Sequence, residues 1–250
     1  MKSHIGCVRQ INEDYYACTV DLNGRVLAVV ADGMGGHQAG EIASRLAVER
    51  IMEELRHLER GLDAVDERER LMQAILRANE EVYKYSLAHP ECSGMGTTVV
   101  ATLLGPGGGV TAHIGDSRLY HYSAGKLQLK TEDHSLVQEL MRSGQITQEE
   151  ASVHPQRNVL MRALGTEPDV RIDLGHITWE LGDVVLLCSD GLSNKVHTEV
   201  MEHWLQQPLS LQAQVDGLVQ HALDSGGEDN ITLVAVRNMA KPLDVSEREG

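Results

Sequence analysis

Apolar positions along the chain follow two spacings, and each predicts a different kind of element. Between residues 67 and 87 they return every three or four residues, which places them on one face of a helix. They are Leu71, Ile75, Ala78, Val82 and Tyr85. The same reasoning predicts helices over about 40–58 and 211–223.

Short apolar runs rich in β-branched residues predict strands. They cover residues 25–31, 97–104, 110–114, 119–122, 170–177, 183–188 and 230–236, and Asn12-Glu13-Asp14 opens one more. The stretch from about 134 to 165 is polar, helical and irregular in its pattern. Long helices stand between groups of consecutive strands, which favours antiparallel sheets covered by helices, the α+β class. We predict one domain over residues 1–240, followed by a polar tail at 241–250.

Composition excludes some partners. The formal net charge of -15 disfavours nucleic acid and anionic membranes as partners. The N-terminal sequence lacks the apolar centre of a signal peptide. No apolar run approaches the ~20 residues that a membrane span needs. A cytoplasmic location and a monomer are therefore expected. The four cysteines form no CxxC pair or zinc spacing. Cys7, Cys18 and Cys188 lie in apolar runs, so we expect them to be small buried residues.

Aspartates recur where apolar strands begin or end. A single one of these is most often a turn or helix-cap residue. Several together favour a different interpretation, because neighbouring strand ends bring distant carboxylates close. Oxygen ligands without Cys or His suit Mg²⁺ or Mn²⁺ better than Zn²⁺. The aspartates concerned are Asp14, Asp32, Asp116, Asp190 and Asp229.

An ordered set of motifs carries these aspartates. It comprises RQINED (9–14), VVADGMGGH (29–37), GMGTT (94–98), HIGDSRLY (113–120), DHS (133–135), CSDGL (188–192) and GGEDNIT (226–232). The set resembles the metal-dependent serine/threonine phosphatases of the type 2C, or PPM, family, in particular its compact bacterial members. The resemblance covers nearly the whole chain. It implies two antiparallel sheets packed face to face, with helices on both outer faces.

The resemblance also implies roles for individual residues. Two Mn²⁺ or Mg²⁺ ions would be held by Asp32, the Gly33 carbonyl, Asp190 and Asp229. A third ion would lie near Asp116. Asp14 and Glu13 would act through metal-bound water, and Arg9 would grip the substrate phosphate.

The activity implied is hydrolysis of phosphoserine and phosphothreonine in proteins. A metal-bridging water or hydroxide would attack phosphorus directly. The reaction would reverse the phosphorylation performed by a bacterial serine/threonine kinase. Many eukaryotic relatives carry a histidine proposed as general acid where this chain has Met34. His37 is the candidate here for binding substrate or donating a proton. An equally weighted alternative is that His37 only shapes the loop before the helix. Cys188 lacks a CxxxxxR phosphate loop, which argues against a cysteine nucleophile.

The segment at about 135–165 corresponds to the family's variable flap beside the site, where Arg157, Asn158 and Arg162 are candidates to touch phosphopeptide. Three other readings remain open from the sequence. They are a non-catalytic relative that binds phosphoprotein or metal, a two-metal hydrolase of phosphodiesters or nucleotides, and a phosphatase dedicated to one small regulatory protein. The set of acidic metal ligands is complete, which argues against a non-catalytic relative. The net charge argues against nucleic acid as the substrate of a two-metal hydrolase.

Overall fold

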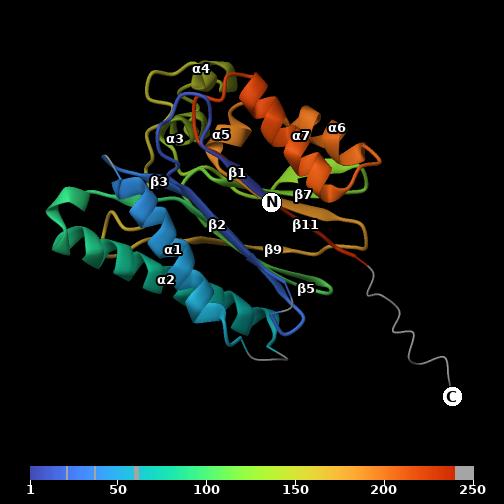
Figure 1. Ribbon diagram of the computed structural model, residues 1–250, viewed down its shortest axis with the longest axis horizontal. Coiled ribbons are helices and arrows are strands. Elements are labelled where there is room, and N and C mark those ends of the chain that lie inside the picture. The colour runs from blue at the N-terminus through green and yellow to red at the C-terminus, as the bar shows by residue number, and fades with distance from the viewer. Residues whose placement is uncertain (21, 37, 59–61, 240–250) are drawn as a thin grey trace.

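The computed structural model describes residues 1–20, 22–36, 38–58 and 62–239 (Figure 1). The predicted tail at 241–250 lies outside the described residues. The strands are β1 (Lys2–His4), β2 (Asp14–Thr19), β3 (Val26–Met34), β4 (Gly96–Thr97), β5 (Val99–Gly105), β6 (Gly108–Ile114), β7 (Arg118–Ser123), β8 (Lys126–Leu129), β9 (Asp173–Ile177), β10 (Val184–Cys188) and β11 (Ile231–Arg237). The helices are α1 (Ala39–Leu55), α2 (Ala64–Ala88), α3 (Leu136–Arg142), α4 (Gln148–Ser152), α5 (Asp190–Ser193), α6 (Thr198–Gln206) and α7 (Leu211–Asp224).

The strands form two sheets. The first has the order β2-β3-β5-β6-β9, with β4 paired to β3, and the second has the order β1-β11-β10-β7-β8. Neighbouring strands pair antiparallel in both sheets. Helices α1 and α2 cover the outer face of the first sheet, and α6 and α7 cover the second (Figure 1). The predicted α+β sandwich with helices on both faces is therefore confirmed.

Alternating side chains explain why the central strands are apolar throughout. In β3, Val29 and Ala31 face α1, whereas Ala28 and Val30 face the other sheet. In β10, Val185 and Leu187 point into the same space between the sheets. Successive side chains of a strand point to opposite faces, so a strand buried on both faces needs apolar residues at every position.

Local chemistry sets the start of α2. The apolar spacing predicted a helix from residue 67, but α2 begins at Ala64. The side chain of Asp63 accepts hydrogen bonds from the backbone N–H groups of Val65 and Asp66, at 2.8 and 2.9 Å. This cap satisfies donors that the first helical turn leaves free, so the helix extends beyond its apolar stripe.

Four elements had no prediction: β1, β8, α5 and α6. Strand β8 lies at the edge of the second sheet, and only Leu127 of its four residues is buried, so it leaves little apolar signal. Helix α6 does carry apolar residues at helical spacing, at positions 200, 201, 204 and 205, so its periodicity was present in the sequence. Within the described residues, no helix is long and apolar enough to span a membrane.

The space between the sheets gives a stability test. Leu187 is fully buried there, whereas Leu181 is 67% exposed in the turn before β10. We expect Leu187→Ala to lower the free energy of unfolding by about 2–5 kcal/mol, because it removes buried contacts and leaves a cavity. Leu181→Ala is the matched control, with a change within about 0.5 kcal/mol. Urea denaturation measures both, and equal losses would contradict the assigned packing.

Candidate metal centre

Strand ends bring the predicted aspartates together at one end of the sandwich. Asp14 at the start of β2 is the direct partner of Asp32 near the end of β3. Asp190 comes two residues after β10, and Asp229 comes two residues before β11. Asp116 stands between β6 and β7. The carboxyl group of Asp32 experiences the charges of Asp14, Asp190, Asp116 and Asp229, so all five belong to one cluster.

The backbone of Asp32 and Gly33 is held closely. The Asp32 N–H donates to Thr98 Oγ1 at 3.0 Å, and the Thr98 N–H donates to the Asp32 carbonyl at 2.8 Å. The Gly33 N–H donates to the Glu13 carbonyl at 3.0 Å. A side chain at Gly33 would collide with the backbone of Gly40 and Glu13, so only glycine permits this approach.

Asp14 is a buried carboxylate that is only half satisfied. Ser189 Oγ donates to Asp14 Oδ2 at 2.7 Å and accepts a hydrogen bond from the Thr232 N–H at 3.0 Å. Asp14 Oδ1 is buried without a hydrogen-bond partner. The same holds for Oε1 of Glu13. Buried polar atoms normally find a partner, so two orphaned carboxylate oxygens beside this cluster fit a place where a cation or an ordered water binds.

The protonation of the cluster reflects its burial. Burial raises the pKa of Asp14 to about 7 and, with the neighbouring charge of Asp190, raises the pKa of Asp116 to about 7. Two causes hold the pKa of Asp32 well above its usual range. Burial is the larger, and the negative charges of the surrounding carboxylates are the second. The pKa of Asp190 is raised by burial and then by Asp229. Like charges in a poorly solvated place disfavour ionisation, and a divalent cation removes that penalty.

The cluster therefore fits Mg²⁺ or Mn²⁺. Its donors are carboxylate and backbone oxygens, which hard cations prefer, and neither Cys nor His belongs to the cluster of five aspartates. Asp116 lies close enough to Asp190 for their charges to interact, as a shared third ion would require.

Arg9 lies at the rim of the cluster. Its Nη2 donates to Asp229 Oδ2 at 2.8 Å, and its Nη1 lies 3.6 Å from Glu13 Oε2. The guanidinium is exposed. It thus places a planar cationic donor group beside the carboxylates, where an incoming phosphate would meet it. His37 lies outside the described residues.

Three residues that the sequence did not single out hold the cluster together. They are Ser189, Asn230 and Thr98. Asn230 accepts the Glu13 N–H at 2.8 Å and donates to the carbonyls of Ile5 and Ile11, at 2.8 and 3.0 Å. It therefore braces the loop that carries Arg9. Direct adjacency to Asp190 and Asp229 was the signal for Ser189 and Asn230.

A hollow of about 760 Å³ opens over the cluster, and we call it the acidic hollow. Asp116, Asp190 and Asp229 line it from the strand ends. Arg157 and Asn158 line it from the segment predicted as a flap, where α3 and α4 lie. Arg162, the third candidate of that segment, does not line this hollow and bonds Asp173 at 3.1 Å instead.

The cysteines add no nucleophile. Cys188 is fully buried, and burial raises the pKa of its thiol to about 12. A thiolate at this place is therefore unavailable near neutral pH. The expectation of a buried Cys7 was wrong, because Cys7 is exposed in the loop after β1. That loop follows the backbone near Gly227 rather than a strand, so its apolar neighbours are not core residues.

A second group of ligand-type side chains lies nearby, formed by His113, His134 and Asp173. Polar contacts already engage three of its ring nitrogens. His113 Nε2 bonds the Glu132 carbonyl at 2.8 Å, and His134 Nδ1 accepts the Gly115 N–H at 3.1 Å. His134 Nε2 lies 3.1 Å from Arg162 Nη1 and 3.3 Å from Asp173 Oδ2. This group braces the residue before Asp116.

Comparison with known proteins gives concordant matches. The sequence model of the family described as Protein phosphatase 2C matches residues 2–225. The chain is 39% identical, over 92% of each chain, to the serine/threonine phosphatase stp of Listeria monocytogenes serotype 4b. It is similar to the crystal structure of the Mycobacterium tuberculosis serine/threonine phosphatase PstP/Ppp, with a TM-score of 0.86, 38% identity and coverage of 96% and 97%.

A structure of the catalytic domain of PstP is also similar and was solved with two manganese ions. Its TM-score is 0.81, with 36% identity and coverage of 94% of each chain.

Ser189 provides a test of how Asp14 is held. Ser189→Ala removes the buried donor to Asp14, and we expect the free energy of unfolding to fall by about 1–3 kcal/mol. Ser193→Ala is the matched control, because Ser193 Oγ is buried without a hydrogen-bond partner. Its removal is expected to be neutral or stabilising. Chemical denaturation in EDTA measures both, and a Ser189→Ala protein as stable as Ser193→Ala would refute the assigned role.

The raised pKa values also set a pH dependence. A carboxyl whose folded pKa lies near 7 holds its proton in the folded state at pH values where the unfolded chain has lost it. The stability that this bound proton contributes is fully present below the unfolded pKa of about 4, and it is lost as the pH rises to about 7. In EDTA, we expect wild-type stability to decrease relative to Asp116→Asn over this window, measured by urea midpoints at matched pH. A constant difference between the two proteins would argue against it.

Proposed function

Because this chain belongs to the protein phosphatase 2C family, we propose that it hydrolyses phosphoserine and phosphothreonine in proteins with the help of Mn²⁺ or Mg²⁺. The observation that carries this proposal is the cluster of carboxylates with raised pKa values and two orphaned buried oxygens. Such a group is stable in ionised form only with cations beside it.

We assign the ligands as follows. Asp32, the Gly33 carbonyl, Asp190 and Asp229 hold two ions, and Asp116 with Asp190 holds a third. Asp14 and Glu13 act through water, which suits their orphaned oxygens. When bound, these ions supply two effects: they acidify coordinated water and neutralise charge on the phosphoryl oxygens.

Arg9 orients the phosphate. Its exposed guanidinium already forms a charge-assisted hydrogen bond with Asp229 at 2.8 Å, which fixes its direction beside the ligands. A planar fork pairs two phosphate oxygens at once, and such pairing also stabilises charge that spreads over the oxygens during transfer. Ser189 and Asn230 keep Asp14 and the Arg9 loop in place.

Direct hydrolysis is the route that these residues support. Cys188, which precedes Ser189 and Asp190, is buried, and burial raises the pKa of its thiol to about 12, so Cys188 does not serve as a phosphocysteine nucleophile. Met34 stands where many relatives carry a histidine, and its thioether cannot donate a proton. His37 stays a candidate for that role.

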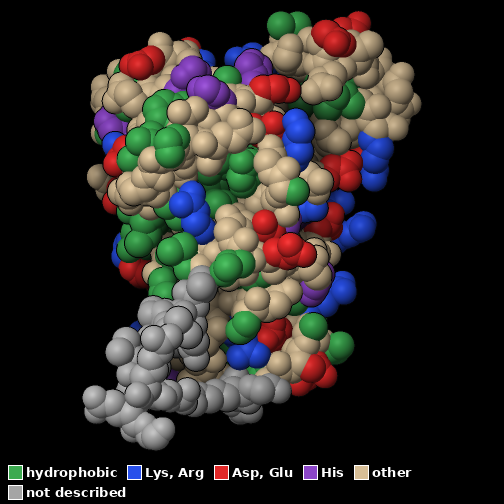
Figure 2. Space-filling model, turned by 90° about the vertical axis from the view of Figure 1, so that its right-hand side faces the viewer, with side chains coloured by type: hydrophobic (Ala, Val, Ile, Leu, Met, Phe, Trp, Pro, Cys, Tyr) green, Lys and Arg blue, Asp and Glu red, His purple; other side chains and the backbone are tan. Residues whose placement is uncertain are grey.

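The substrate is a phosphoprotein in this proposal. On the face shown in Figure 2, acidic and basic side chains are interspersed, and no continuous basic tract suited to nucleic acid is visible on it. We further propose a monomer in the cytoplasm, one catalytic domain over residues 1–240 with a flap at about 135–165, and a serine/threonine kinase whose targets this protein dephosphorylates.

Phosphate release from a phosphothreonine peptide tests the proposal. We expect release with Mn²⁺, none with EDTA, and a loss of at least about a hundredfold in Asp190→Asn, since even residues behind metal ligands contribute up to that much. Asp224→Asn is the control, because Asp224 is exposed at the end of α7. Bis-p-nitrophenyl phosphate runs in parallel. Preferential cleavage of this diester, or equal losses in both variants, would contradict the proposal.

A further inference from the structure

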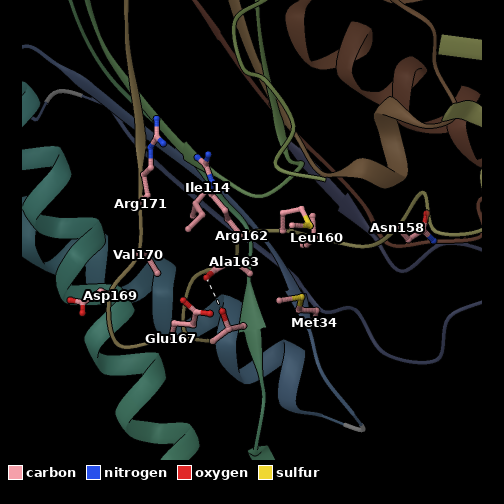
Figure 3. Close-up of a pocket in the computed structure, with 12 residues that line it drawn as sticks. Met34, Ile114, Asn158, Leu160, Arg162, Ala163, Glu167, Asp169, Val170 and Arg171 are labelled. Atoms are coloured by element: carbon pink, nitrogen blue, oxygen red, sulfur yellow. Dashed lines mark hydrogen bonds between the residues drawn. The ribbon is translucent and has the colours of Figure 1, made fainter. Parts of the chain in front are cut away.

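A second hollow of about 530 Å³ shares one lining residue, Asn158, with the acidic hollow, and Figure 3 shows the residues around it. We call it the side pocket. Its lining is mixed, and its apolar part comes from strand ends and from the segment between residues 160 and 170. The apolar residues include Met34, Ile114, Leu160, Ala163 and Val170. The two arginines Arg162 and Arg171 stand on one side of it, and Glu167 and Asp169 stand on the other (Figure 3).

The side pocket continues the acidic hollow. Asn158 lines both, so a chain segment can pass from one to the other along this residue. Met34 ends the strand that carries Asp32, and Ile114 ends the strand that precedes Asp116. The side pocket is therefore attached to the same strand ends as two of the proposed metal ligands.

Buried hydrogen bonds fix the outer wall of the side pocket. Asn79 of α2, only 2% exposed, donates to the carbonyls of Glu167 and Pro168, at 3.1 and 3.0 Å. Its Oδ1 accepts the Gly165 N–H at 2.7 Å. The side chains of this loop are largely exposed, so a buried amide with three bonds serves to place the loop. A pocket with walls set in advance binds without the cost of ordering them.

The charges at the rim disfavour an acidic occupant. Asp173 takes a hydrogen bond from Arg162 at 3.1 Å and lies 3.8 Å from Arg171, so it offsets part of their positive charge. Glu167 and Asp169 on the opposite rim repel an acidic side chain. An uncharged apolar side chain meets no such penalty and buries its surface against Met34 and Leu160.

We propose that the side pocket binds an apolar side chain of leucine or methionine size that flanks the phosphorylated residue of the substrate. This assignment rests on the proposed function. It gives the enzyme a preference among phosphoproteins that the metal centre alone, which meets only the phosphate, cannot provide.

Phosphothreonine peptides that differ at one flanking position test it. Leucine, glycine or aspartate is placed in turn at each of the two residues on either side of phosphothreonine. The readout is the ratio of kcat/KM between the leucine and glycine peptides, with p-nitrophenyl phosphate as a substrate that has no flanking residue. For the wild type we expect a ratio of about ten at one position, the usual discrimination of an apolar pocket.

Two variants fill the side pocket from different rims, Thr166→Trp and Asp169→Trp, and both positions are exposed. We expect each to bring the ratio close to one. Leu181→Trp is the control, since Leu181 is exposed and lines neither hollow, and we expect it to keep the wild-type ratio. Circular dichroism checks that each variant is folded.

Each other outcome has a definite meaning. Equal rates for all peptides, with metal-dependent cleavage of p-nitrophenyl phosphate intact, would overturn this inference and leave the proposed function standing. A preference for aspartate would overturn it in favour of recognition by Arg162 and Arg171. Selectivity that survives both tryptophan variants would place the preference elsewhere. No cleavage of any substrate would overturn the proposed function and this inference together.

Discussion

Repulsion among carboxylates at one end of the sandwich is the constraint on which the rest of the structure depends. Asp14, Asp32, Asp116, Asp190 and Asp229 come from separate strand ends, and their charges act on one another where solvent is scarce. A folded chain tolerates this arrangement only if protons or cations offset the charge. Near neutral pH, divalent cations are the effective choice, and their chemistry is the one that phosphate hydrolysis needs.

The scaffold resists this repulsion through neutral hydrogen bonds. Ser189 joins Asp14 to the strand that bears Thr232, while Thr98 holds the backbone of Asp32. Asn230 ties the Arg9 loop to the start of β11. Apolar packing between the sheets fixes the strands themselves. These contacts hold the strand ends in place, which is what a precise oxygen ligand set requires.

Much of this arrangement could be predicted from the sequence, because apolar periodicity reports burial and aspartates at strand ends report convergence. The helix over 67–87 and the strand before Asp190 are of this kind. Strand β8, with one buried residue among four, left no such signal, whereas α6 carries apolar residues at helical spacing that the prediction overlooked. The roles of Ser189 and Asn79 depend on partners far away in sequence, which spacing does not reveal. The expected burial of Cys7 was wrong for a related reason, because a short apolar run near a terminus does not establish a buried strand.

In our proposal, the two hollows divide the work between chemistry and selection. The acidic hollow would bind the phosphate, which every phosphoserine or phosphothreonine shares. The side pocket would bind a residue that flanks it. Asn158 lines both, so one bound segment can use both at once.

Manganese binding to the purified protein tests the central claim most directly. Isothermal titration at pH 7.5, after removal of metal with EDTA, gives the number of ions bound per chain for wild type and for Asp32→Asn. The account predicts at least two Mn²⁺ per wild-type chain and a loss of at least one in the folded variant. A folded wild-type protein that binds no Mn²⁺, or an Asp32→Asn protein that binds as many ions as tightly, would contradict it.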